Sequence, residues 1–107
     1  MIVLEALQAL RKSLFEEADK LMIQKGMDYN GEQQKGGLML EGLRTATSIG
    51  AVSSPTQTCL VFICNKLGRL ASLQFKDPAV KGESVRDTVV DSINYLTYFL
   101  AFYEEAR

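Results

Sequence analysis

One set of polar residues has the spacing of a binding or catalytic surface. Intervals of four, three and four residues separate its members, which places them on one face of a helix: Asp87, Asp91, Asn94 and Tyr98. Two aspartates one turn apart repel each other unless a cation or a basic side chain lies between them. Oxygen donors of this kind suit Mg²⁺ together with phosphate groups. The alternative is that Asp87, three residues after Ser84, completes a capping box at a helix start.

Two further groups of polar residues each contain a basic side chain. Lys66 and Arg69 are three residues apart in a segment that is otherwise largely apolar. They either form ion pairs with the acidic face or bind a phosphate group. The other group, Lys25, Asp28 and Tyr29, precedes a glycine-rich segment, where residues of these types also serve in turns.

The composition excludes several classes of protein. The 107 residues contain no histidine, so catalytic triads and metal sites that need imidazole are excluded. The net charge of −1 gives no general attraction to DNA. Apolar runs are far shorter than the ~20 residues of a membrane span, and the first residues lack the basic region of a secretory signal. We therefore expect a cytoplasmic protein that binds neither DNA nor membranes.

The hydrophobic pattern predicts the elements that must position these residues. Helices are expected over residues 2–25 and 55–75, and from the N-cap Ser84 to about residue 106. Residues 38–50 favour a short helix, with a strand as the alternative. Gly26 is a typical helix end, whereas Ser54 before Pro55, and Ser84, are typical helix starts. The sequence therefore predicts an all-α fold, a bundle of three long helices and one short helix, in a single domain over residues 1–107.

Two of the predicted helices carry long apolar stripes. The stripe of the first helix comprises Val3, Leu7, Leu10, Leu14, Ala18 and Leu21, and that of the last comprises Val85, Val89, Ile93, Leu96, Leu100 and Tyr103. Helix 55–75 is apolar nearly all round in its first half. Because a chain of this length has too little interior for all of this surface, we expect a homo-oligomer, a dimer or a higher even assembly.

Three sequence blocks resemble a known family: KGMDY at residues 25–29, NKLGRL at 65–70 and ESVRDTVVDSINY at 83–95. Together they look like the nucleotide modification associated domain 1 family, which is common in bacteriophages and is linked to nucleotide metabolism. The resemblance implies a single helical nucleotide-binding domain and, for a phage-encoded chain, the host cytoplasm as its location.

An all-α chain with acids on its last helix is also similar, more distantly, to the MazG-like nucleotide pyrophosphohydrolases. Those proteins hold Mg²⁺ between acidic residues of two helices, whereas helix 55–75 of this chain carries no carboxylate. The resemblance therefore favours a pocket for a phosphorylated ligand. We expect Lys66 and Arg69 on phosphate. Asp91 or Asn94 would then contact ribose or base, and Tyr29 or Tyr98 would stack on the base.

Three functions remain open from the sequence. The first is a phage-type protein that sequesters a phosphorylated nucleotide without a cofactor and without turnover. If that ligand is a host immune signalling nucleotide, the protein would have an anti-defence function. Its expected ligand-binding residues are Lys25, Asp28, Tyr29, Lys66, Arg69, Asp87, Asp91, Asn94 and Tyr98. The second is a Mg²⁺-dependent nucleotide pyrophosphohydrolase, whose metal ligands would be Glu83, Asp87 and Asp91. The third is a helical protein-interaction module.

Overall fold

Four helices account for the regular structure of the described residues in a computed structural model of the chain. The structure describes residues 1–30, 41–76 and 84–107, apart from the side chains of residues 26–30, 41, 42 and 46. The helices are α1 (Leu4–Asn30), α2 (Glu41–Ser48), α3 (Pro55–Leu73) and α4 (Val85–Glu105). No strand occurs within these ranges, so the predicted all-α class is confirmed. No helix of the described residues is long and apolar enough to cross a membrane.

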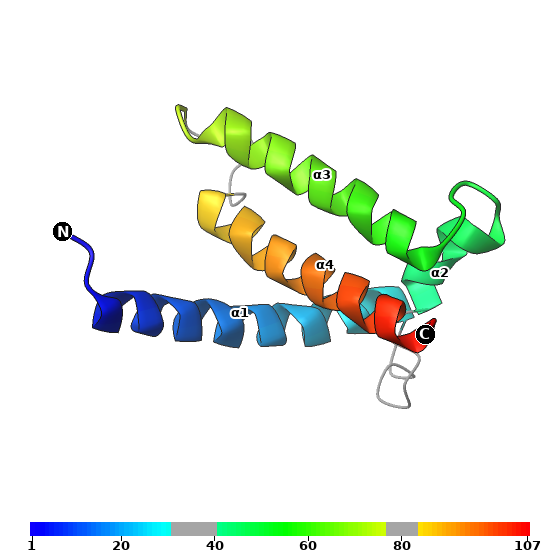
Figure 1. The fold of residues 1–107 in the computed structure, drawn as a ribbon, viewed down its shortest axis with the longest axis horizontal. Coiled ribbons are helices and arrows are strands. Elements are labelled where there is room, and N and C mark those ends of the chain that lie inside the picture. Colours follow the sequence, from blue (N-terminus) through cyan, green and yellow to red (C-terminus); the bar gives the residue numbers. More distant parts are fainter. Residues whose placement is uncertain (31–40, 77–83) are drawn as a thin grey trace.

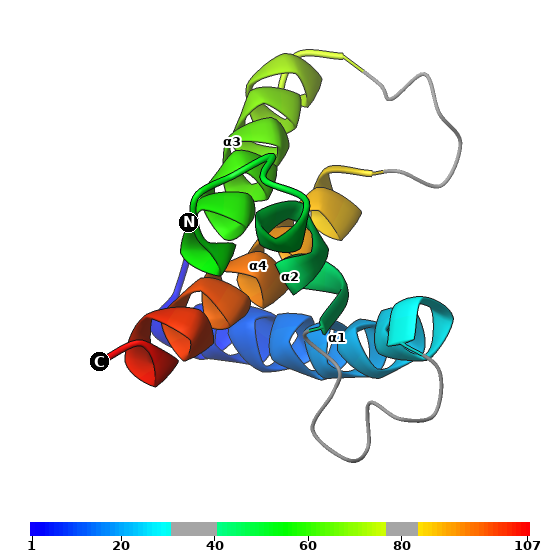
Figure 2. The ribbon, with the colours of Figure 1, turned by 90° about the vertical axis from the view of Figure 1, so that its right-hand side faces the viewer.

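Helix α4 is the central element of the fold. It lies between α1 and α3 and contacts both, while α2 packs across α3 and α1 near the C-terminal end of α4 (Figure 1). The view turned by 90° shows the same order, with α3, α4 and α1 following one another across the molecule (Figure 2). Residues from all three long helices can therefore meet only around α4.

The start of α3 is determined by short-range hydrogen bonds. The Ser54 hydroxyl accepts a hydrogen bond from the Gln57 backbone N–H, and Pro55 occupies the first turn, where a missing N–H has no cost. The predicted start at Ser54 and Pro55 is therefore confirmed.

The start of α4 is a full capping box. The Ser84 hydroxyl accepts from the Asp87 backbone N–H at 3.0 Å, and the Asp87 carboxylate accepts from the Ser84 backbone N–H at 3.0 Å. The predicted start at Ser84 is confirmed as well.

The prediction that the first helix ends at Gly26 is wrong, because α1 continues to Asn30. A glycine inside a helix costs about 0.5–1 kcal/mol relative to alanine, which weakens a helix without ending it. Among the described glycines a positive φ occurs at Gly50, at +79°, two residues beyond the end of α2. That conformation suits the turn that leads from α2 towards α3.

Burial on α4 also differs from the prediction. The expected core stripe is largely exposed, with Val85, Leu96, Leu100 and Tyr103 between 43% and 54% accessible. The buried residues of α4 are instead Thr88, Val90, Asn94 and Phe102. The reason is that α1 and α3 flank α4, so its buried surface is set by two packing directions rather than by its most apolar stripe.

Candidate functional site

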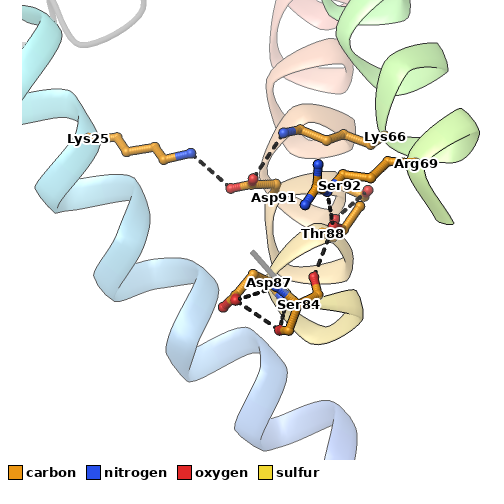
Figure 3. Close-up of polar contacts among 8 residues, drawn as sticks. All are labelled: Lys25, Lys66, Arg69, Ser84, Asp87, Thr88, Asp91 and Ser92. Atoms are coloured by element: carbon orange, nitrogen blue, oxygen red, sulfur yellow. Dashed lines mark hydrogen bonds and ion pairs between the residues drawn. The ribbon is translucent and has the colours of Figure 1, made fainter. Parts of the chain in front are cut away.

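Three helices bring charged side chains together around Asp91. The Lys25 ammonium, from α1, donates to Oδ1 of Asp91 at 2.9 Å, and the Lys66 Nζ atom, from α3, lies 3.1 Å from Oδ2 (Figure 3). The Asp91 side chain is 16% exposed and that of Lys66 is 25% exposed, so this ionic contact is largely shielded from water. Each oxygen of the carboxylate thus has its own lysine.

Helices α3 and α4 pack antiparallel, and their side chains pair at regular intervals. Moving three or four residues forward along α3 and back along α4 gives three cross-helix pairs: Phe62 with Tyr95, Lys66 with Asp91, and Arg69 with Thr88. The rings of the first pair are stacked, with centroids 4.9 Å apart and planes 14° apart. The charged pair therefore lies one helical turn, about 5.4 Å, from an aromatic pair.

Arg69 extends the basic surface by one further turn. Its Nε atom donates to the Thr88 hydroxyl at 3.2 Å, and that hydroxyl donates to the Ser84 carbonyl at 3.0 Å. Thr88 is only 2% exposed, so it anchors the guanidinium side chain against α4. The predicted basic pair, Lys66 and Arg69, is thus held on the same side of α3 as Asp91 (Figure 3).

Asp87 has a different role from Asp91, although one turn separates them. Its Oδ2 atom accepts from both the backbone N–H and the hydroxyl of Ser84, at 3.0 and 2.8 Å. These hydrogen bonds hold the pKa of the Asp87 carboxyl below its usual range. The capping role considered from the sequence is the one that the structure shows.

Asn94 and Tyr98 point into packed regions. The Asn94 side chain, 5% exposed, donates to the Ala18 carbonyl of α1 at 3.0 Å. Burial, together with the nearby Tyr95, Asp91 and Cys59, raises the pKa of Tyr98 to about 12. The common helical face inferred from spacing is therefore divided between the ionic cluster, the α1–α4 interface and the aromatic side of α4.

Some of the predicted residues lie outside the described part of the chain. Glu83 is not described, and the side chains of Asp28 and Tyr29 are not described either, although their backbone belongs to α1. Lys25, from the same sequence block, is the member that the structure brings to Asp91.

The described carboxylates do not fit the magnesium site of the hydrolase alternative. Asp91 is engaged by two ammonium groups, and Asp87 is engaged by its cap. Glu17, an acid of the first helix, pairs with Arg86 at 3.0 Å. Within the described ranges no three acidic, cysteine or histidine side chains gather as metal ligands. A divalent cation would therefore have to displace both lysines from Asp91.

Sequence reasoning missed the aromatic pair beside the cluster. Phe62 stands four residues before Lys66, and Tyr95 four residues after Asp91, so each ring lies about one helical turn from its charged neighbour. This matching spacing is visible in the sequence, but it predicts a ring pair beside the charged pair only if α3 and α4 are taken to pack antiparallel.

Comparisons with known proteins do not extend this picture. No protein-family model matches the chain. No curated protein and no solved structure is significantly similar to it. The geometry of the described residues is therefore the main support for a function.

Proposed function

We propose that the protein binds a phosphorylated nucleotide at the cluster formed by Lys25, Lys66, Arg69 and Asp91, and holds it without hydrolysis. The observation that carries the proposal is that Lys66 shares its carboxylate partner with a second lysine. An ammonium group has three N–H donors, and Asp91 engages one side of it. A phosphate oxygen would supply the remaining hydrogen bonds and negative charge.

In this proposal Asp91 positions the two lysines rather than contacting ribose or base. Both of its oxygens are engaged, one by each ammonium group. Asp91 holds the side chains from α1 and α3 at one point, and its carboxylate competes with a bound anion for both ammonium groups. Arg69, fixed by Thr88 one turn away, adds a planar donor suited to a second phosphate oxygen.

The aromatic layer supports a nucleotide rather than a simple phosphate. Phe62 is 36% exposed and stacks on Tyr95, one turn from the Lys66–Asp91 pair. A base stacked on such a ring gains about 1–3 kcal/mol, with little dependence on which base it is. The sequence resemblance described above favours the same ligand class, and with it a phage-type sequestering protein that acts in the host cytoplasm against an immune signalling nucleotide.

We also propose that the binding protein is a homo-oligomer. The chain exposes 7721 Å² of surface, whereas a folded monomer of 11.9 kDa is expected to expose about 6,000 Å². The difference of about 1,700 Å² exceeds the ~800 Å² that each partner buries in an interface of standard size. The radius of gyration, 15.4 Å, is likewise larger than the ~13 Å of a globular chain of this length.

The experiment for the proposed function is mass spectrometry of the purified protein. The native mass shows whether a small molecule is bound, and the extracted molecule is then identified after denaturation. The same sample is measured again after incubation with Mg²⁺. We expect an intact nucleotide in both samples. A hydrolysed product after Mg²⁺ addition would indicate the pyrophosphohydrolase. A protein that carries no small molecule and does not bind added nucleoside monophosphates would contradict the proposal.

A further inference from the structure

The apolar stripe of α1 is covered over only half of its length. In the C-terminal half, Ala18 is 2% exposed, and α4 packs against it through Asn94. At the N-terminal end, Val3, just before the helix, and Leu7 and Leu10, within it, are 50%, 50% and 46% exposed. One continuous stripe therefore passes from a packed region to an unpacked one.

The stripe of α1 changes from covered to exposed near the point where α4 begins. In the first turn of α4, Arg86 contacts Glu17 at 3.0 Å and Ser13 at 2.9 Å, both on α1. The N-terminal turns of α1 extend past the start of α4, as Figure 1 shows. The stripe thus continues where its own chain supplies no described helix to cover it.

The spacing of the stripe indicates what would cover it. Val3, Leu7 and Leu10 recur at intervals of four and three residues, the pattern by which one helix packs along another. The outer face of α4 has a stripe with the same spacing and a similar exposure of 43–54%: Leu96, Leu100 and Tyr103. Each copy of the chain thus carries two uncovered stripes of matching length.

We infer that a second copy of the chain covers the N-terminal stripe of α1 with the outer stripe of its α4. In a two-fold dimer the same contact forms twice, so a single kind of interface covers both stripes of both copies. The surface excess of about 1,700 Å² per chain is large enough for two such contacts. This interface involves no residue of the cationic cluster, so it is independent of the proposed ligand.

Light scattering of the 107-residue chain tests the inference. The wild type is expected at twice 11.9 kDa at micromolar concentration. Leu7→Glu and Leu100→Glu should each shift the mass towards 11.9 kDa with unchanged helix content, because both side chains are half exposed in the single chain. Phe75→Glu is the matched control, since Phe75 is 86% exposed and lies on neither stripe. A monomeric wild type, or an assembly that Phe75→Glu weakens as much as Leu7→Glu does, would overturn the inference.

Disulfide trapping identifies which stripes meet, without a disruptive substitution. The exposed Cys64 is first replaced by serine, and the buried Cys59 is kept. Chains carrying Leu7→Cys are then mixed with chains carrying Leu100→Cys under mild oxidation. A covalent dimer that forms in the mixture, and not in either variant alone, supports the α1–α4 contact between copies. A covalent dimer of the Leu7→Cys chain alone, with none added by mixing, would contradict it.

Discussion

The Lys66 ammonium group lies 3.1 Å from Asp91, one helical turn from the point where Phe62 stacks on Tyr95. The same antiparallel register of α3 and α4 produces both pairs. It places a charged layer beside an aromatic layer, a combination suited to the phosphate and the base of a nucleotide. The predictions below separate this binding role from a purely structural one.

Replacing Lys66 with alanine should weaken nucleotide binding more than it weakens the fold. Loss of a hydrogen bond to a charged group costs about 1.5–3 kcal/mol, or roughly 10- to 150-fold in Kd. The free energy of unfolding should change little, because Lys25 remains on Asp91. Calorimetric titration with the co-purified nucleotide and urea unfolding measure the two effects. Lys20→Ala, on the exposed side of α1, is the control. An unchanged Kd with a lowered urea midpoint would make Lys66 a structural residue.

Asp91→Asn should have opposite effects on stability and on anion binding. The amide cannot neutralise two ammonium groups, so the free energy of unfolding should fall by about 1–3 kcal/mol. The folded fraction should bind inorganic phosphate more tightly, since no carboxylate then competes for the lysines. Asp87→Asn is the control, because its parent carboxylate belongs to the Ser84 cap and should leave phosphate binding unchanged. Loss of phosphate binding in Asp91→Asn would show that the carboxylate itself is required for binding.

Asn94→Ala should lower stability and leave binding unchanged. The side chain is buried and donates to the Ala18 carbonyl, so its removal takes a hydrogen bond from the α1–α4 interface. We expect the free energy of unfolding to fall by about 1–2 kcal/mol in urea unfolding. Asn65→Ala, at an exposed position of α3, should have no such effect. A larger Kd for the co-purified nucleotide at unchanged stability would show that Asn94 belongs to the binding surface.

Tyr98 should make the protein less stable at alkaline pH. Burial raises the pKa of its hydroxyl from 10.0 to about 12 in the folded state, so the folded chain keeps a proton that the unfolded chain releases. The corresponding stability is fully present below pH about 10 and is lost as the pH rises through about 12. Absorbance titration of tyrosinate and urea unfolding across this window measure both quantities. Tyr98→Phe should remove the late-titrating tyrosine, whereas Tyr103→Phe should retain it.

The helix starts could be predicted because their causes are local. Ser54 and Ser84 accept hydrogen bonds from backbone groups three residues ahead, so a few consecutive residues contain the whole interaction. The same locality explains the capping role of Asp87, which its spacing from Ser84 already indicated. The end of α1 was mispredicted at Gly26 because a glycine lowers helix stability without deciding whether the helix continues.

The sequence by itself determined the all-α class, the helix starts and the residue types available for binding a phosphate. Only the tertiary structure decided which of those residues meet. Lys25 reaches Asp91 across 66 residues of sequence, and that contact depends on how α1 and α3 pack on either side of α4. Asp91 and Asn94 share a helical face by spacing, yet one meets two lysines and the other is buried against α1. The physical reason is that spacing fixes directions around one helix axis, whereas the positions of neighbouring helices decide what lies in each direction.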